Sequence, residues 1–255
     1  TSDAYRRIRN TARFLLANLH GFDPVKDLVA ADKMLMLDRW IVDQARQLQD
    51  TVLEAYNNYE FHVIYQRVHN FCSYELGSFY LDVIKDRQYT CKTDGIPRRS
   101  AQTALYYIAE ALVRWIAPIL SFTAEEIWPH IPGKRAESVF LSSWYTDFPV
   151  FSNNTELQDN FWRKLLAVRD EVNKVLENER KVSGLGSGLE AEVVLYCDDE
   201  LQQDLVKLQD ELRFVLITSQ AVLAPLAQAP DTAVKTEVPG LLVSMAKSTH
   251  SKCQR

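Results

Sequence analysis

The strongest chemical signal in the sequence is a cluster of arginines near its start. The stretch Tyr5–Arg13 reads YRRIRNTAR and places four arginines within eight positions. Arg6, Arg9 and Arg13 are spaced three and four positions apart, so on a helix they would share one face. A guanidinium pairs bidentately with phosphate oxygens, and such a face could therefore follow the backbone of RNA. It could equally be a solvated face that is balanced by carboxylates of neighbouring helices, and composition leaves both interpretations open.

Motifs for catalysis are absent from the sequence. Gly184, Gly186 and Gly188 precede a predicted strand, whereas a phosphate-binding loop follows a strand and opens a helix. His62 and His69 are seven positions apart and could share a helix face, but ordinary core or surface histidines explain them better than a metal pair. We therefore predict no catalytic residue and no metal site from these patterns.

A second basic group lies on a predicted helix that follows residue 155. Acidic residues are interleaved with it, and this alternation is typical of an exposed, salt-bridged helix rather than of a binding stripe. The basic members are Arg163, Lys164, Arg169, Lys174, Arg180 and Lys181, and the acidic ones are Asp170, Glu171, Glu177 and Glu179.

The five tryptophans are candidates for base stacking, because every nucleobase offers a flat face to an aromatic ring. Large aromatic side chains are nevertheless a main component of protein cores, and we expect core positions for them. They are Trp40, Trp115, Trp128, Trp144 and Trp162.

The elements that must position these groups begin with a helix bundle over residues 1–150. Apolar residues recur every three or four positions, which is the pattern of amphipathic helices. The periodic segments are 5–19, 37–56, 61–83 and 105–119. Thr123-Ala-Glu-Glu126 fits a capping box that would open a further short helix, with both glutamates in its first turn. Long helices joined by short connections predict a bundle.

The character of the sequence changes after Pro149, so we place a domain boundary near residue 150. Thr155 with Gln158 could cap a linking helix that carries Phe161 to Leu176. A small α/β unit is predicted to complete residues 151–255. Its elements are a Gly/Ser-rich turn at 183–188, a strand at 191–195, a helix at about 199–212, and strands at 214–217 and 240–245.

Length, composition and charge exclude several classes of protein. The 255 residues, of which 47% are hydrophobic, suffice for two globular domains. The net charge of −5 argues against an indiscriminate nucleic-acid binder, although an acidic protein can carry a basic face. Four widely spaced cysteines fit a reducing compartment, and no apolar run approaches the roughly 18 residues of a membrane span. We expect a cytoplasmic monomer without a membrane partner.

Several segments resemble the anticodon-binding region of isoleucyl-tRNA synthetases. The stretch YRRIRNTARFLL resembles the helix that opens the anticodon-binding bundle of that family. Further similar segments follow in the family's order, at 37–40, 70–76, 80–87, 120–128 and 210–215. The start YRRIRN and the segment Leu189–Val193 favour the isoleucyl member over the related valyl, leucyl and methionyl enzymes.

The resemblance implies that the bundle binds the anticodon arm of isoleucine tRNA. We predict that Arg6, Arg9 and Arg13 pair with phosphates, and that Asn10 and aromatic side chains contact unstacked loop bases. Part of this face could instead dock on the catalytic domain of the same enzyme. The other interpretations are the equivalent region of a valyl- or methionyl-tRNA synthetase, and a helical protein-interaction scaffold with no RNA role.

The family's two ATP-site signatures, HIGH and KMSKS, do not occur in these 255 residues. The resemblance therefore implies that the catalytic and editing domains lie upstream, and that this part alone has no aminoacylation activity. ATP with Mg and zinc would be cofactors of the full-length enzyme only. Cys253 matches the first thiolate ligand of the family's zinc knuckle, but the partner ligands are missing, so we predict no zinc here.

Overall fold

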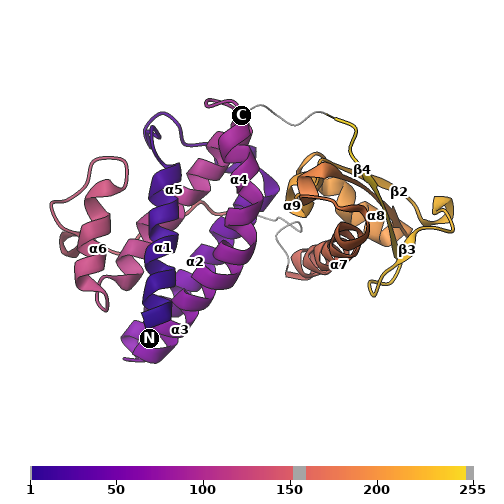
Figure 1. Cartoon of the computed structure of the whole chain (residues 1–255). Coiled ribbons are helices and arrows are strands. Elements are labelled where there is room, and N and C mark those ends of the chain that lie inside the picture. Colours follow the sequence, from indigo (N-terminus) through magenta and orange to yellow (C-terminus); the bar gives the residue numbers. More distant parts are fainter. Residues whose placement is uncertain (1, 152–158, 251–255) are drawn as a thin grey trace. The chain divides into compact units, whose positions relative to one another are not determined.

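The computed structural model describes residues 2–151 and 159–250, and the chain divides into two compact units (Figure 1). Unit 1 is Thr1–Asn153 and unit 2 is Asn154–Arg255. Unit 1 is a bundle of helices, and unit 2 combines helices with a small sheet. The predicted fold class, a mainly helical bundle followed by a small α/β region, is therefore confirmed.

The described part of unit 1 contains six α-helices. The helices α2 and α5 pack against each other, and α1 packs on α5 and α3. The α-helices are α1 Ser2–Asn18, α2 Met36–Asn57, α3 Phe61–Phe71, α4 Leu81–Thr90, α5 Ile96–Ile116 and α6 Ser121–Ile127. The 3₁₀ turns are η1 Ala31–Lys33, η3 Trp128–His130 and η4 Val139–Leu141.

The first helix follows the predicted periodicity. Its inward stripe of Ala4, Ile8, Ala12 and Leu15 is 1–3% exposed, and this burial fixes which face meets the bundle. The helix ends at Asn18, and Gly21 follows with φ +72°, a backbone conformation that side chains larger than glycine disfavour. The polar face of α1 is consequently turned outward along its whole length.

Residues 61–83, predicted as one helix, are helical but contain a segment of different geometry that the apolar pattern does not predict. Between α3 and α4 the chain adopts a wider π-helical segment, η2 Cys72–Tyr80. A Cβ atom on Gly77 would lie 2.8 Å from the carbonyl oxygen of Cys72, so the segment requires glycine there. Thr11 of α1 donates to the same carbonyl oxygen over 3.5 Å, which ties the widened turn to α1.

The capping box predicted at Thr123–Glu126 is wrong. The helix α6 begins two residues earlier, at Ser121, and no side chain caps it. Thr123 is buried inside the helix, where its hydroxyl donates to the Tyr5 hydroxyl over 3.3 Å. The backbone N–H of Ala124 bonds to the carbonyl of Leu120, so the chain is helical before the predicted start. Both glutamates therefore lie in the last turn of α6.

Unit 2 carries a mixed four-stranded sheet in the order β2-β1-β4-β3. The strand β1 pairs parallel with β2 and antiparallel with β4, and β3 pairs antiparallel with β4. Alternate residues of β1 are buried, as the predicted alternation requires. The elements are α7 Asp159–Ser183, η6 Gly188–Glu190, β1 Ala191–Cys197, α8 Asp199–Leu205, η7 Val206–Leu208, α9 Glu211–Leu216, β2 Gln220–Pro225, η8 Leu226–Gln228, β3 Val234–Lys235 and β4 Leu241–Lys247.

Two predictions for unit 2 are wrong. The run 214–217 is predicted as a strand, but its first three residues end the short helix α9, which buries Leu212, Val215 and Leu216 at helical spacing. Ile217 follows the helix with a left-handed φ of +55°. The strand comes three residues later, as β2. The helix expected at about 199–212 is interrupted at Gln209, whose φ of +47° is incompatible with a right-handed helix. The predicted cap formed by Thr155 with Gln158 lies outside the described residues.

Candidate nucleic-acid interface

All four predicted contact residues lie on the outer face of α1. Arg6, Arg9, Asn10 and Arg13 are exposed, opposite the buried stripe of the same helix. The spacing therefore brings the three guanidinium groups onto one face, as predicted from the sequence. A flat or curved polyanion could lie along this face without moving the helix.

The arginines of α1 differ in how their charge is balanced. Arg9 forms a bidentate pair with Glu126 of α6, in which Nη1 lies 2.6 Å from Oε2 and Nη2 lies 2.6 Å from Oε1. Arg7 pairs with Asp3 over 3.1 Å on α1 itself. Within residues 2–151 and 159–250, Arg6, Asn10 and Arg13 have no hydrogen-bond or ion-pair partner. Two of the four arginines are therefore paired with carboxylates, and two are open.

The paired groups remain charged at neutral pH. Hydrogen bonding to Arg9 holds the pKa of Glu126 below its ordinary value, and the same contact raises the pKa of Arg9. Hydrogen bonding to Arg7 likewise lowers the pKa of Asp3. Both pairs are exposed to water, so they are open to competition from other ions.

The arginine face borders a groove of about 870 Å³. Arg9, Asn10 and Arg13 line it from α1, while Glu126 and His130 line it from α6 and η3. His20, just beyond the end of α1, also lines the groove, and apolar side chains complete it. A volume of this size falls in the range of small-ligand pockets.

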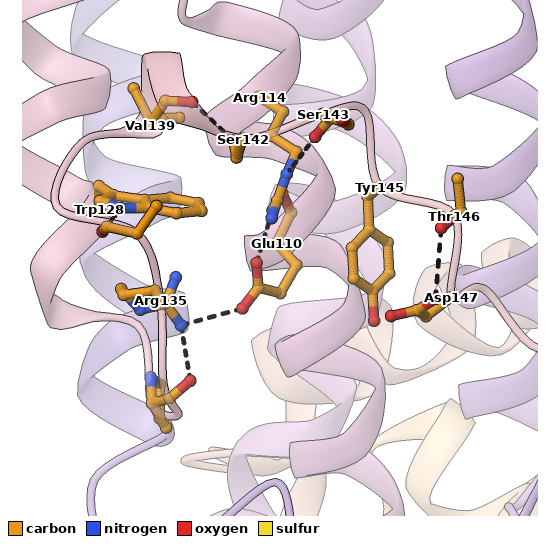
Figure 2. Close-up of polar contacts among 12 residues, drawn as sticks. Glu110, Arg114, Trp128, Arg135, Val139, Ser142, Ser143, Tyr145, Thr146 and Asp147 are labelled. Carbon is orange, nitrogen blue, oxygen red and sulfur yellow. Dashed lines mark hydrogen bonds and ion pairs between the residues drawn. The ribbon is translucent and has the colours of Figure 1, made fainter.

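A buried ion cluster holds the wall of the groove opposite α1 (Figure 2). Glu110 of α5 accepts from Arg114 Nη1 over 2.5 Å and from Arg135 Nη2 over 2.9 Å. Arg135 also donates to the carbonyl of Pro132 over 2.6 Å, and Arg114 donates to the carbonyl of Ser143 over 2.9 Å. Because Pro132 itself lines the groove, these contacts fix that wall to the core of the bundle.

Trp128 completes the cluster, as Figure 2 shows. The guanidinium carbon of Arg114 lies 4.8 Å from the Trp128 ring centroid, and that of Arg135 lies 4.6 Å away. Both distances are within the reach of cation–π attraction. The indole Nε1 donates to the carbonyl of Ala136 over 2.8 Å. Trp128 is thus a core residue that stiffens the segment after α6, and it is not a free stacking platform.

The other tryptophans also meet the expectation of core positions. Trp40, Trp115 and Trp162 are at most 6% exposed, and Trp144 is half-buried. Trp115 donates to Gln49 Oε1 over 3.1 Å inside the bundle.

Three of the six basic residues on α7 pair with carboxylates, as the alternating charges predict. Lys164 pairs with Glu200 and Asp204 of α8, at 2.6 and 3.2 Å. Lys174 lies between Glu171 and Glu237, at 2.6 and 3.1 Å. Arg180 pairs with Glu177, and Arg169 donates to the carbonyl oxygen of Val215. Arg163 and Lys181 have no ion pair among the described residues.

Three ionisable residues of the groove are not predicted from the sequence. Glu126 is predicted at the start of a helix, and no pattern links it to Arg9, 117 positions away. His20 and His130 also line the groove, and no sequence motif singles them out. Only the fold brings them together, so no signal in the sequence could have identified them.

The described ranges contain no group of three or more histidine, cysteine or acidic side chains arranged to hold a metal ion. Cys253, the predicted family match to a zinc ligand, lies outside those ranges. Among the helices that the structure describes, none combines the length and the apolar character that crossing a bilayer requires.

Comparison with known proteins defines the class. Residues 38–195 match the family described as the anticodon-binding domain of tRNA ligase, and the chain belongs to that family. The helix α1, with its arginine face, precedes the matched range.

Individual relatives point to one kind of ligase. The chain is 60% identical to an isoleucine–tRNA ligase of Psychromonas ingrahamii, 59% to that of Azotobacter vinelandii and 57% to that of Pseudomonas aeruginosa. Each similarity covers the whole chain and 27% of the relative. The chain therefore spans about a quarter of the length of the ligases that it resembles.

Proposed function

We propose that the chain is the anticodon-binding part of an isoleucine–tRNA ligase and that it binds the anticodon arm of isoleucine tRNA. In this proposal the outer face of α1 holds phosphates, and the adjacent groove receives an unstacked loop base. Phosphate contacts position the RNA, whereas contacts to base edges carry its identity. Asn10, which has an amide donor and acceptor at the rim of the groove, is the proposed base contact.

The observation that carries the proposal is the open charge of Arg6 and Arg13 beside a groove of suitable size. Exposed guanidinium groups without carboxylate partners retain their full capacity for bidentate pairing with phosphate. Sequence-specific RNA recognition usually targets loops, whose bases can leave the stack and enter a pocket. The family of the chain and its identity to isoleucine–tRNA ligases support this choice of RNA.

Two rival functions are less well supported. A helical scaffold with no RNA role predicts that internal carboxylates neutralise the basic face, and for Arg6 and Arg13 no such partner exists in the described part of the chain. An equivalent region of a valyl- or methionyl-tRNA synthetase is disfavoured by the isoleucine–tRNA ligases among the relatives, at 57–60% identity.

The activity of the full-length protein follows as part of the same proposal. It would join isoleucine to its tRNA with ATP and Mg in the cytoplasm, as a monomer, through catalytic and editing domains outside these residues. Zinc would belong to the full-length protein as well. Cys253 alone cannot complete a tetrahedral site, so no step is assigned to zinc here.

Binding of isoleucine tRNA as a function of salt tests the proposal. We expect the affinity to fall steeply with salt, since neutralised phosphates release counterions. An isoleucine tRNA with an altered anticodon should compete less well than the unaltered tRNA. Binding that ignores the anticodon, or no binding to tRNA at low salt, would contradict the proposed function.

A further inference from the structure

The acidic residue at the groove is placed where an RNA phosphate would compete with it. In the described residues, Glu126 is the only carboxylate that lines the groove, where it lies among Arg9, Arg13, His20 and His130. It does not support the helix that carries it, because it lies in the last turn of α6. Its partner is instead Arg9, on another helix and 117 positions earlier in the chain.

The geometry of the pair is that of a phosphate contact. Two guanidinium nitrogens of Arg9 meet two oxygens of Glu126, both at 2.6 Å, and a phosphate group presents two oxygens in the same manner. The Tyr5 hydroxyl lies 3.5 Å from Arg9 Nη1 and accepts from Thr123, so a second group also contacts the guanidinium. Arg9 is thus held ready for a two-oxygen anion, and Glu126 occupies that position.

Water has free access to this pair. The side chain of Arg9 is 43% exposed and that of Glu126 is 57% exposed. Exposed ion pairs are weak and are screened by salt, so an incoming phosphate can displace the carboxylate.

We propose that Glu126 competes with RNA phosphate for Arg9 and thereby weakens sequence-independent RNA binding at the α1 face. This inference rests on the proposed function, because it assigns a role within the same RNA site. Removal of the competing carboxylate should turn Arg9 into an additional phosphate contact. Base recognition in the groove should be unaffected, since phosphate contacts carry no sequence information.

The proposal can be tested through the salt dependence of RNA binding, which reports how many phosphates the protein neutralises. When phosphate displaces Glu126 from Arg9, the carboxylate stays beside the RNA, and its negative charge offsets the neutralisation that Arg9 supplies. The exchange therefore adds almost nothing to the salt dependence of binding. Without the carboxylate, the same contact adds roughly 0.7–0.9 to the slope of log affinity against log salt.

The test compares Glu126→Gln with the wild-type chain. The probes are a synthetic anticodon stem–loop of isoleucine tRNA and a hairpin of equal length with an unrelated loop. We expect the slope to steepen by about 0.7–0.9 for both RNAs. The affinity at low salt should rise up to about fivefold, the scale of one exposed ion pair. Glutamine keeps the shape of the side chain, and the thermal unfolding midpoint verifies the fold.

Two further variants identify the cause. Arg9→Ala combined with Glu126→Gln should return the slope to the wild-type value, because the gain acts through Arg9. Asp3→Asn is the matched control, since it also removes one carboxylate from an exposed arginine pair of α1. Neither Asp3 nor Arg7 lines the groove, so the salt slope of the Asp3→Asn variant should stay at the wild-type value.

The outcomes separate this inference from the proposed function. An unchanged slope in Glu126→Gln, or an equal gain in Asp3→Asn, would overturn the competition while leaving tRNA binding intact. Weaker binding of Glu126→Gln would also overturn it and would make Glu126 a direct RNA contact. Absence of salt-dependent binding by the wild-type chain would instead refute the proposed function itself.

Discussion

The carboxylate of Asp38 and the guanidinium of Arg87 form a bidentate pair in the centre of unit 1, with N–O distances of 2.7 and 3.1 Å. Each side chain is at most 1% exposed. Tyr80 and Ser100 donate to the same carboxylate over 2.7 and 2.6 Å. One aspartate therefore joins α2 to α4, to η2 and to α5, and α1 packs on α5 and η2 of this group.

Asp38→Ala should destabilise the chain by about 3–5 kcal/mol, because it leaves the charge of Arg87 buried without its carboxylate. Chemical denaturation followed by circular dichroism measures the effect. The control is Asp50→Ala on the same helix, whose side chain is 70% exposed and lies 3.6 Å from Arg46. That change should stay within about 1 kcal/mol. Equal losses in the two variants would show that the buried pair is not a main support of the bundle.

The periodic features of unit 1 could be predicted from the sequence, because they depend on local spacing. The stripe of α1 and the shared face of Arg6, Arg9 and Arg13 follow directly from 3.6 residues per turn. The buried apolar stripe of α2 follows from the same helical repeat. The strand prediction for residues 214–217 is wrong for a physical reason. A short apolar run fits a buried strand or one face of a short helix equally well.

The pairings across the fold could not be predicted. Asp38 and Arg87 are 49 positions apart, and Arg9 and Glu126 are 117 apart. Nothing in the local pattern links such partners, because tertiary packing alone brings them together. The candidate site was therefore predictable on its α1 side only, and the opposite wall of the groove required the structure.

Glu110→Ala should loosen the segment that follows α6. Arg114 and Arg135 would both lose their carboxylate partner. Because their side chains are only 14% and 10% exposed, water cannot fully replace it. We expect a loss of about 3–5 kcal/mol in stability and faster amide hydrogen exchange through residues 128–147. Glu137→Ala, at an exposed position in the same segment, is the control and should leave exchange unchanged. Unaltered exchange in Glu110→Ala would mean that the cluster does not hold the groove wall.

The stability of the fold should decline at alkaline pH, partly through Cys72. Burial raises the pKa of its thiol to about 12, from an ordinary value of 9.0. Between these values the unfolded chain has lost the proton that the folded chain keeps, so rising pH favours unfolding. Cys72→Ala should flatten the fall in stability above pH 9 by up to about 1.4 kcal/mol per pH unit.

The half-exposed Cys91 offers a matched comparison for the burial of Cys72. Alkylation at pH 8 gives a second measurement, in which native Cys91 should react faster than the buried Cys72 and Cys197. Rapid alkylation of Cys72 in the folded chain would contradict the burial on which this prediction depends.

Replacing Arg6, Arg9 and Arg13 together by Ala should weaken tRNA binding and flatten its salt dependence. Arg6 and Arg13 are the open cations, and each lost phosphate contact removes roughly 0.7–0.9 from the log–log slope. Arg9 exchanges Glu126 for a phosphate and so adds almost nothing to the slope. The expected reduction in the slope is therefore about 1.4–1.8, from Arg6 and Arg13 alone. Affinity should change more than discrimination between anticodons, since phosphate contacts position the RNA without reading its sequence.

A second triple variant separates the α1 face from net charge. Arg46, Lys174 and Arg180 are cations outside α1, and their replacement by Ala removes the same total charge. Each is paired with a carboxylate, which makes it a poor phosphate ligand, so the slope should hardly change. Both variants must retain wild-type helicity by circular dichroism. If the two triple variants reduce the slope equally, tRNA responds to overall charge, and the arginines of α1 are better explained as docking residues for another domain of the ligase.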